Sequence, residues 1–383
     1  MMRHPAAGAA DVERHAQEPK GMRAEVDARE QRVLGRIEQA RSRPAHFRDA
    51  QITMAHGAGG KATRTLIEGL LVPAFGSASL GELADAGTVR LEGLGLALTT
   101  DSFVVKPLRF PGGSIGELAV NGTVNDLAVA GARPVALTLA LVLEEGLPAE
   151  ALRAEVEAIG AAARTAGVEI VAGDTKVVER GHADGMYVCT TGLGVLDPRA
   201  SLSPRALKPG DRIVVSGPIG AHGTAIMLAR GEFELDAAIE SDTCSLWPAM
   251  DALLAAAGPG LRCVRDATRG GVASALNELA LASGVAMLVR ERAVPVDPAV
   301  AGACEILGID PMYVANEGRL VACVAPELAD AAVAALCRVQ GSERAAEIGE
   351  VRSEPPGMVL VETAFGGKRV MDLLVGDPLP RIC

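Results

Sequence analysis

Residues 149–196 read AEALRAEVEAIGAAARTAGVEIVAGDTKVVERGHADGMYVCTTGLGVL, and this stretch decides the fold class. The spacing of its apolar residues predicts a helix over Ala149–Ala166, a buried strand over Val168–Ala172 and an alternating strand over Met186–Leu196. Because a helix and strands alternate within fewer than fifty residues, this part of the chain is expected to build a sheet covered by helices. The fold class predicted is therefore α+β.

The same pattern continues on both sides. Upstream, Leu94–Thr100 is typical of a buried strand and Gly116–Ala130 of a helix. Downstream, the turn-rich residues 197–204 read DPRASLSP and separate two blocks, so we place a domain boundary near Pro204. The second block opens with a predicted strand at Arg212–Ser216. It continues with helical patterns at 221–230, 242–257, 270–284, 298–307 and 327–340, and with apolar strands near 286–289, 319–325 and 358–361.

Four segments follow from this organisation. Residues 1–50 mix Arg and Glu with Ala and predict an accessory extension that is disordered or loosely helical. Residues 51–204 form an N-terminal domain, 205–370 a C-terminal α+β domain, and 371–383 a mobile tail. We find no short-period repeat and no Rossmann fingerprint.

Composition and charge exclude several classes of protein. The chain has 383 residues, 49% of them hydrophobic, and a formal net charge of −11, which argues against wholesale disorder and against nucleic-acid binding. The longest apolar run, Leu127–Leu143, is interrupted by Arg133 and Pro134, so no membrane span is expected. Charged residues near the start, such as Arg3, stand where a signal peptide needs an apolar region. A cytoplasmic enzyme is expected.

The last of seven cysteines differs from the other six. No CxxC pair or Cys/His cluster has metal-ligand spacing, and six cysteines lie in apolar or pre-helical surroundings that favour a packing role: Cys189, Cys244, Cys263, Cys304, Cys323 and Cys337. Cys383 ends a tail containing Pro378 and Pro380, which predicts an extended segment that presents an exposed, reactive thiol. The alternative is that the chain simply ends there.

A glycine-rich loop precedes a predicted helix at residues 55–61, AHGAGGK. Its bare backbone amides, at Gly59 and Gly60, suit close approach to phosphate oxygens, and Lys61 adds a positive charge. It is not a Walker A loop, because Ala62 stands where a Ser or Thr would hold magnesium. A tight turn without a ligand explains the same residues, so this loop alone does not predict a nucleotide site.

Three aspartates stand where ligands often collect. Asp101 ends the predicted strand Leu94–Thr100, Asp126 follows Asn125 in a helix, and Asp174 follows the strand Val168–Ala172. Carboxylates at strand ends can converge on a metal-bound polyphosphate, and Mg²⁺ favours a few carboxylates plus phosphate oxygens. Taken singly, each aspartate is better explained as a cap or turn residue, and only the three together favour a metal site.

Three further positions have the chemistry of an anion site or a base. Lys176, two residues after Asp174, can neutralise phosphate charge or be a solvated surface lysine. In the run 265–271, RDATRGG, Arg269 and Gly270 enter a predicted helix and can face an anion or merely cap that helix. Glu317, beside a glycine turn, is a candidate base, although turn chemistry also accounts for it.

Several of these strings, in this order, carry a resemblance: AHGAGGK (55–61), TTDSFVVKP (99–107), NGTVNDLAV (121–129), VAGDTKVVERG (171–181), RDATRGGV (265–272), ANEGRL (315–320) and the terminal PRIC (380–383). Together they closely resemble the hydrogenase maturation factors called HypE, from about Met54 to Cys383. HypE is a member of the ATP-binding superfamily of aminoimidazole ribonucleotide synthetase. Residues 1–50 depart from the usual short start of the family.

The resemblance implies a fold and a reaction. It implies two α+β domains, with the N-terminal domains pairing in a homodimer as a β-barrel and ATP bound nearby. It implies that a carbamoyltransferase, HypF, loads a carbamoyl group on the terminal cysteine, which the enzyme dehydrates with ATP to a thiocyanate. The cyano group then passes to iron on the HypC–HypD complex, toward the cyanide ligands of nickel–iron hydrogenase.

The resemblance also implies roles for residues. Cys383 carries the substrate, Lys176 contacts phosphate and activates oxygen, and Glu317 removes a proton. Asp101, Asp126 and Asp174 hold Mg²⁺ and ATP. Further nucleotide contacts are expected from Gly59, Gly60, Lys61, Asn125, Arg269 and Gly270.

Two other functions stay open from the residues alone. The chain could be a selenophosphate synthetase or a kinase of the same superfamily, although the former needs a reactive cysteine or selenocysteine near the glycine-rich loop and residues 54–61 have none. From a different class, it could be a carrier with a terminal cysteine that binds ATP only as a conformational ligand.

Overall fold

The computed structural model describes residues 46–57, 59–75, 84–231, 237–374 and 382–383. The predicted extension at 1–50 therefore lies outside the described residues except for its last five, and the predicted mobile tail lies outside them at 375–381. The glycine-rich loop leads into a run of short helices. These are η1 (Met54–Gly57), α2 (Lys61–Leu66), a π-helical segment η2 (Ile67–Leu71) and α3 (Val72–Phe75).

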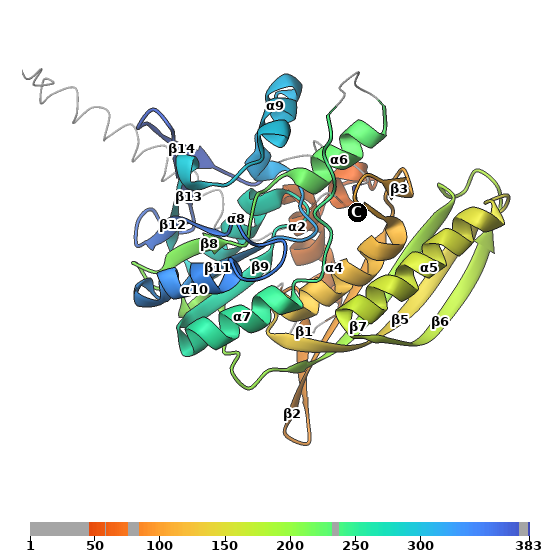
Figure 1. Ribbon diagram of the computed structural model, residues 1–383, viewed down its shortest axis with the longest axis horizontal. Helices are drawn as coiled ribbons and strands as arrows, with labels where there is room; N and C mark the ends of the chain where they lie inside the picture. Colours follow the sequence, from red (N-terminus) through yellow and green to blue (C-terminus); the bar gives the residue numbers. More distant parts are fainter. Residues whose placement is uncertain (1–45, 58, 76–83, 232–236, 375–381) are drawn as a thin grey trace, which may run out of the picture. The chain divides into compact units, whose positions relative to one another are not determined.

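The N-terminal half is built on a five-stranded sheet. Its strand order is β1-β2-β7-β5-β6, and β5 and β6 are its one parallel pair among the described strands. The elements are β1 (Gly87–Leu91), β2 (Leu94–Phe103), α4 (Ile115–Val129), β5 (Ala132–Glu144), α5 (Ala149–Ala166), β6 (Glu169–Val178) and β7 (Met186–Leu196), with a small hairpin of β3 (Arg109–Phe110) and β4 (Gly113–Ser114) before α4. Figure 1 shows α4 and α5 side by side over one face of this sheet.

Local sequence signals explain where these two helices begin and end. Ser114 caps α4 by accepting from the backbone N–H of Glu117, a Ser-x-x-Glu arrangement typical of helix starts. Helix α5 ends at Gly167, whose φ of 69° lies in the left-handed region that closes a helix. The helices bury Val120, Val124 and Ile159 against the sheet. Both helices match their predicted ranges to within one residue.

The predicted burial of two strands was wrong. In β2, Ala97 and Phe103 are buried while Leu98 is 43% exposed, because in the described part of the chain α4 and α5 cover one face of this sheet. Strand β6 continues to Val178 and is exposed along most of its length, because it lies at the edge of the sheet. Consequently Asp174 and Lys176 lie within this strand and not after it.

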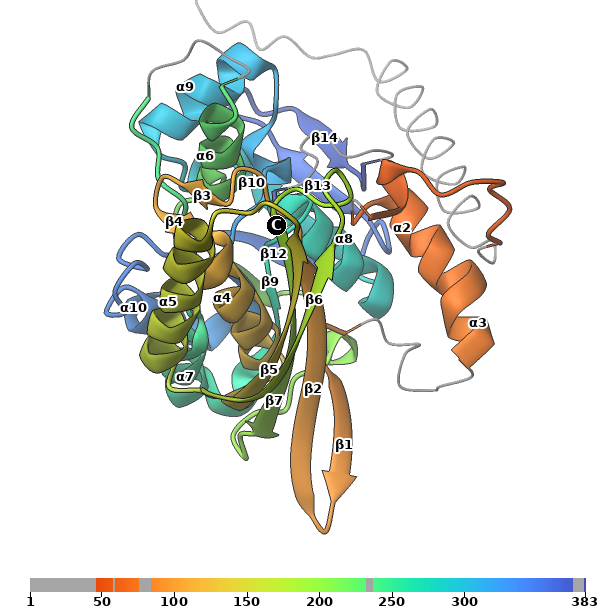
Figure 2. The ribbon, with the colours of Figure 1, turned by 90° about the vertical axis from the view of Figure 1, so that its right-hand side faces the viewer.

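The predicted barrel does not close within one chain. Across the described residues the sheet stays open, with β1 at one edge and β6 at the other. Figure 2 shows the β1–β2 hairpin extending away from the rest of the sheet. Strand β1 pairs only with Leu94–Leu98, so the remainder of β2, which carries Asp101, has β7 on one side and no described strand on the other.

The C-terminal half is built on a seven-stranded sheet of order β14-β13-β10-β12-β8-β11-β9. Its strands are β8 (Arg212–Val215), β9 (Leu261–Asp266), β10 (Ala286–Arg290), β11 (Leu320–Val324), β12 (Ala346–Arg352), β13 (Val359–Glu362) and β14 (Lys368–Met371). Its helices are α6 (Ala221–Ala229), α7 (Trp247–Ala257), α8 (Gly271–Ser283), α9 (Pro298–Leu307) and α10 (Ala329–Leu336). Short 3-10 turns lie at Pro204–Ala206, Gly258–Gly260, Glu291–Ala293, Pro311–Tyr313 and Pro326–Leu328.

Helices cover both faces of this second sheet, so its strands β8, β10 and β11 are almost entirely buried. Helix α8 packs with one set of strand residues, including Ile213 and Val321. Helices α7 and α10 pack with the alternate set, including Val214 and Ala322. All five residues of β11 are buried, as expected for a strand covered on both faces. Among the described residues, no helix combines the length and the apolar character needed to cross a membrane.

A third cluster of buried side chains joins the two halves, and we call it the shared core. From the N-terminal half it includes Phe103 and Ile115, and from the C-terminal half Ile226 and Val314. The penultimate residue, Ile382, is buried in the same cluster. The end of the chain is thus packed between the halves, and Figure 1 marks it beside the β3–β4 hairpin.

Candidate active site

An acidic cluster lies where α4 and β2 meet the C-terminal half, and we define it as Asp85, Asp101, Asp126, Asp266 and Glu317. Thr123 in α4 donates to Asp101 across 3.0 Å, and Thr99 in β2 donates to Asp126 across 2.7 Å. The two carboxyls lie close enough for the charge of Asp101 to raise the pKa of Asp126, after burial. The structure therefore brings together two of the three predicted metal ligands.

Electrostatics within this acidic cluster are unfavourable without a cation. Burial raises the pKa of Asp126 well above its usual range, and the negative charges of Asp101, Asp266 and Asp85 raise it further. Burial, and after it the negative charge of Asp85, also raise the pKa of Asp266. Crowded buried carboxylates are a common environment for a divalent metal ion, which cancels their repulsion.

Two arginines border the cluster. Arg265 pairs with Asp85, and both are largely buried. The positive charge of Arg269 lowers the pKa of Asp101 and that of Glu317, although burial outweighs it at both carboxyls. Arg269, predicted to contact the nucleotide, is thus close to Asp101, a predicted metal ligand, and to Glu317, the predicted base.

A cavity of about 200 Å³ adjoins the acidic cluster, and its lining includes Gly59, Asp85, Asp266 and Arg269. Gly59 has a φ of 75°, and a Cβ built on it would lie 3.2 Å from the Cβ of Arg269, so glycine lets these two segments approach closely. The start of α8, at Gly271, also faces the cavity. Backbone amides, a guanidinium and carboxylates around one cavity suit a nucleotide phosphate with its metal ion.

Two other predicted nucleotide contacts, Gly60 and Lys61, belong to the glycine-rich loop at residues 55–61. The Lys61 ammonium is 2.8 Å from a carboxylate oxygen of Asp372, and its backbone N–H donates to the carbonyl of Leu374. A Cβ on Gly60 would lie 2.6 Å from that same carbonyl oxygen. The loop is therefore held against the end of strand β14. Gly270, at a φ of 74°, forms the entry to α8.

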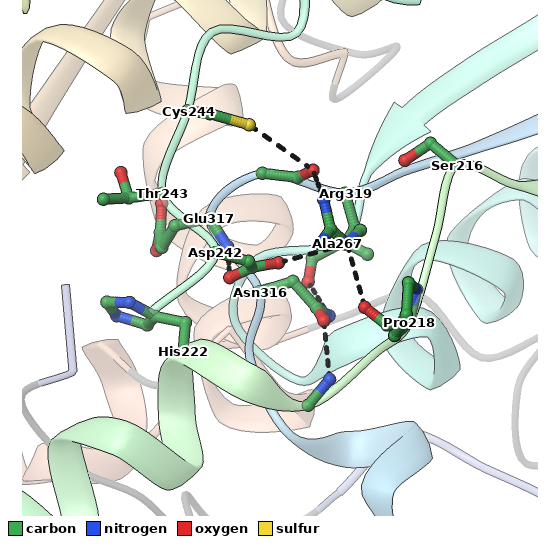
Figure 3. A network of polar contacts seen from close by, with 12 residues as sticks. Ser216, Pro218, His222, Asp242, Thr243, Cys244, Ala267, Asn316, Glu317 and Arg319 are labelled. Atoms are coloured by element: carbon green, nitrogen blue, oxygen red, sulfur yellow. Dashed lines mark hydrogen bonds and ion pairs between the residues drawn. The ribbon is translucent and has the colours of Figure 1, made fainter. Parts of the chain in front are cut away.

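Glu317 is buried, 2% exposed, in the loop before β11. Its backbone N–H donates to Asp242 across 3.0 Å, and its carbonyl accepts from the side chain of Asn125 across 3.1 Å. Figure 3 shows Asp242 and Glu317 next to each other in this network. The Oε1 atom of Glu317 is buried, and no described residue hydrogen-bonds it.

The pKa of Glu317 is raised well above its usual range, first by burial and then by the charges of Asp266 and Asp242. A carboxylate with an elevated pKa accepts a proton more readily near neutral pH than an ordinary glutamate. The unpartnered oxygen and the raised pKa both suit the base predicted at this position.

Asp174 and Lys176 are not part of the acidic cluster within one chain. Asp101, Thr190, Leu139 and Gly173 form one row across the sheet, so β6 lies three strands, or roughly 14 Å, from Asp101. Asp101 faces α4, and because neighbouring strand residues point to opposite faces, Asp174 faces the side without helices. There it pairs with the exposed Lys176, whose hydrogen bond is the main cause that lowers its pKa.

The carboxyl terminus lies inside the protein, and the expectation that Cys383 is exposed was wrong. Cys383 is half-buried, its carbonyl accepts from the backbone N–H of Val104 across 3.2 Å, and Ile382 is 3% exposed. The ring of His222 contacts the Ile382 carbonyl at 2.6 Å. Burying an isoleucine contributes about 1.5–3 kcal/mol and each neutral hydrogen bond about 1 kcal/mol, so this docked end can be released.

Three of the other cysteines are less buried than expected. Cys263, Cys304 and Cys323 are buried, as predicted. Cys189, Cys244 and Cys337 are half-buried. Cys244 lies beside Glu317, and burial raises the pKa of its thiol to about 11, which keeps that sulfur protonated at neutral pH.

Sequence reasoning missed Asp85, Asp242 and His222. Asp85 and Asp242 have no local pattern that distinguishes them from surface aspartates, and His222 falls in an ordinary helical run. Asp266 lies within the run 265–271, where the sequence predicts nucleotide contacts for Arg269 and Gly270 but no role for Asp266. No group of three His, Cys, Asp or Glu side chains among the described residues has the geometry of a preformed metal site.

The chain matches two family models in sequence order. Residues 83–196 match the N-terminal domain of AIR synthase related proteins, and residues 208–361 match their C-terminal domain. A carbamoyl dehydratase HypE of Rhodobacter capsulatus is 49% identical over 340 residues, covering 88% of this chain and 99% of that protein.

Solved structures give the same result. A HypE in a HypE–HypF complex is 43% identical, with a TM-score of 0.77 over 81% of this chain and 99% of that chain. A HypE solved in complex with ATP is 43% identical, with a TM-score of 0.73 over 87% of this chain and all of that chain.

Proposed function

The chain belongs to the family of HypE carbamoyl dehydratases, and from this premise we propose that it acts on a carbamoyl group carried by its own Cys383. The reaction is an ATP-dependent dehydration: the S-carbamoyl group becomes a thiocyanate, and ATP becomes ADP and phosphate. The cyano group serves the Fe(CN)2CO centre of nickel–iron hydrogenase during its maturation. The observation that supports Cys383 most strongly is its half-buried position beside the shared core, next to the buried Ile382.

The chemistry has two requirements that the site can meet. A carbamoyl oxygen leaves poorly, so ATP first converts it into a phosphate ester, which departs as phosphate. The amide nitrogen must lose its protons as the C≡N bond forms, and Glu317 is our candidate to accept one. Its buried, unpartnered Oε1 and its raised pKa support this role.

We infer that the phosphates of ATP and Mg²⁺ occupy the cavity and the acidic cluster. We assign Asp101 and Asp126 to Mg²⁺: burial is the first cause of their raised pKa values, neighbouring carboxylates raise them further, and a divalent cation relieves that repulsion. Bound Mg²⁺ would neutralise phosphate charge at the reacting end of ATP. We assign the phosphates to the cavity between Gly59 and Arg269. Supporting contacts are proposed from Gly60, Lys61 and Gly270, whereas Asn125, predicted as a fourth, is buried and already donates to the carbonyls of Cys244 and Glu317.

A second copy of the chain accounts for Asp174 and Lys176. Both side chains are exposed on the face of the sheet opposite α4 and α5, and β6 is an edge strand among the described strands. The part of β2 that carries Asp101 also has an open side. A two-fold pairing of the two sheets in a homodimer would bring β6 of one copy beside β2 of the other and complete a barrel. Lys176 of the partner subunit would then contact the phosphates, and Asp174 of the partner subunit the metal ion.

Mixing two inactive variants tests this arrangement. Asp126→Ala and Lys176→Ala damage different parts of the site, so random heterodimers have one complete site if Lys176 acts across the interface. About a quarter of the wild-type activity should then return when equal amounts are mixed through unfolding and refolding. If no activity returns although heterodimers form, Lys176 acts within its own chain or not at all.

Three protein partners follow from the proposed reaction. HypF, a carbamoyltransferase, would load Cys383, and the HypC–HypD complex would receive the cyano group. HypF recognition is supported by the similarity to the HypE of the HypE–HypF complex. We place this exchange in the cytoplasm.

The decisive experiment follows the mass of the C-terminal peptide. The protein is incubated with the transferase, carbamoyl phosphate and ATP, and the peptide that ends in Cys383 should first gain one carbamoyl group and then lose one water. ADP formation should match the lost water one to one, because carbamoyl phosphate releases a phosphate of its own when the group is loaded. If the carbamoyl group reaches iron without ATP hydrolysis, the protein is a carrier with a regulatory ATP site, and the proposed dehydration is wrong.

A further inference from the structure

The side chain of His222 hydrogen-bonds the penultimate residue of the chain, Ile382. It lies in the first turn of α6, and its ring is fully buried. The Nε2 atom is 2.6 Å from the carbonyl oxygen of Ile382, and Nδ1 is 2.8 Å from the hydroxyl of Ser241. Phe110 packs its ring edge to face against the imidazole, with centroids 5.6 Å apart.

The partners of the ring determine its proton arrangement. A backbone carbonyl can only accept, so Nε2 carries the proton and donates to Ile382. In the neutral ring Nδ1 then accepts from the Ser241 hydroxyl, which itself accepts from the backbone N–H of Thr243 across 3.2 Å. Burial lowers the pKa of His222 and favours this neutral form, although the charge of Asp242 opposes it. Every donor in the chain of contacts has an acceptor.

The same short segment also holds the candidate base. Ser241 contacts His222, and the next residue, Asp242, accepts from the backbone N–H of Glu317. On the other side, the start of α6 is tied to the residues just before Glu317, because the N–H of Gly220 donates to Asn316 across 2.7 Å. Figure 3 shows His222 beside Asp242 and Glu317. The docked terminus and Glu317 are thus held by one set of contacts.

We propose that His222 is a positioning residue: it holds the Ile382 carbonyl so that the Cys383 carbamoyl group is presented to Glu317, an inference that rests on the proposed function. Residue 222 touches no reacting atom. Its contribution is to favour the docked position of the terminus over the released one. Loading by the transferase needs the released terminus, whereas dehydration needs the docked one, so the two steps should respond oppositely to a change at His222.

Accessibility of Cys383 tests the docking without any enzyme activity. In the full-length protein, a pulse of iodoacetamide labels Cys383, and mass spectrometry of the C-terminal peptide gives the labelling rate. His222→Leu should label about tenfold faster, as expected when one buried hydrogen bond to the terminus is lost. His222→Gln, whose amide can still donate, should label within threefold of wild type. Thr224→Val is a matched control in the same helix, because the Thr224 hydroxyl donates to the carbonyl of Gly220 and not to Ile382 or Cys383, and it should label like wild type.

Single-turnover dehydration of the carbamoylated protein is the second readout. For His222→Leu we expect dehydration to slow about tenfold while loading by the transferase is unchanged or faster, and His222→Gln to recover most of the dehydration rate. Equal labelling and equal dehydration in wild type and His222→Leu would overturn the proposal. A loss of loading and dehydration together would also overturn it, because it indicates general damage. If His222→Leu does not fold, His222→Asn, whose shorter amide cannot reach Ile382, replaces it.

The outcomes separate this inference from the proposed function. If wild-type protein never loses water from its carbamoyl group, the proposed function fails, and the labelling rates still decide whether His222 holds the terminus. If wild type dehydrates normally and the labelling rates do not differ, only the role of His222 fails.

Discussion

The side chain of Asn125 donates to the backbone carbonyl of Glu317 across 3.1 Å and so ties helix α4 to the loop of the candidate base. The same amide donates to the carbonyl of Cys244 at 2.9 Å, and its oxygen accepts from the N–H of Leu246 at 2.7 Å. Three backbone groups of the C-terminal half thus depend on one side chain of the N-terminal half.

Asn125→Ala should therefore lower the free energy of unfolding by about 3 kcal/mol, because it leaves buried backbone groups without partners. Urea unfolding measures this. Asn121→Ala is the matched control: Asn121 lies one turn earlier and makes a single 3.3 Å contact with Thr243, so its cost should be nearer 1 kcal/mol. If both variants lost the same free energy of unfolding, the hydrogen bonds of Asn125 would not be what holds the two halves together.

Cys383→Ala should abolish acceptance of the carbamoyl group while ATP binding survives, since the thiol and the phosphate cavity use different residues. Mass spectrometry of the C-terminal peptide and a nucleotide titration check the two parts. Cys189→Ala, which alters another half-buried cysteine, should load normally. Normal labelling of Cys383→Ala would refute the assignment of the carrier residue.

Asp126→Asn should weaken Mg²⁺-dependent ATP binding by about tenfold or more, yet stabilise the metal-free protein at neutral pH. It removes one charge from a buried cluster whose repulsion and burial raise the Asp126 pKa. Calorimetric titration with Mg²⁺ and ATP measures the first effect. An unchanged affinity would remove Asp126 from the site.

The stabilising effect of Asp126→Asn should depend on pH in one direction. Because the folded-state pKa of Asp126 is raised, its destabilising effect is present at neutral pH and disappears as pH falls toward about 4, the ordinary aspartate value. Unfolding curves of both proteins from pH 8 to pH 4, without metal, should therefore converge. If the difference in unfolding free energy between the two proteins grew toward low pH, the raised pKa of Asp126 would be contradicted.

Glu317→Gln should slow single-turnover dehydration by at least about a hundredfold, the usual contribution of a general base. In wild type the rate should rise with pH through the elevated pKa of Glu317, since the deprotonated form accepts the proton. Glu278→Gln, a second carboxyl with a pKa raised by burial, lines the cavity and should keep this pH profile. A wild-type rate that is flat from pH 5 to pH 8 would exclude Glu317 as the base.

Much of the fold was predictable from local patterns. Helices α5 and α9 follow their predicted ranges because their apolar spacing and flanking glycines are local properties. Strand β5 was not predicted, since Arg133 and Pro134 at its start interrupt the apolar run, and both are accommodated near a register shift in its pairing with β7. Helix α7 begins at Trp247 and not at 242, because the preceding residues bind His222 and Glu317 instead.

The site was predictable in kind but not in arrangement. The family resemblance, which the comparisons confirm, pointed to Asp101, Asp126, Glu317 and Cys383. The order of the strands placed Asp174 three strands away and on the opposite face, and strand order is not a local property of the sequence. Asp85 and Asp266 are 181 residues apart in the chain and lie in the same cluster because the two halves contact each other. No rule based on sequence spacing could have found them.

The attachment of the substrate to the chain has a kinetic consequence. A thiol joined to β14 by only twelve residues meets its own catalytic site at a rate that dilution does not change. Each polypeptide, however, can process one group and must then wait for an acceptor to unload it. The flux of cyanide would consequently be set by how many copies the cell makes and how fast they are emptied, and not by a Michaelis constant for a diffusing substrate.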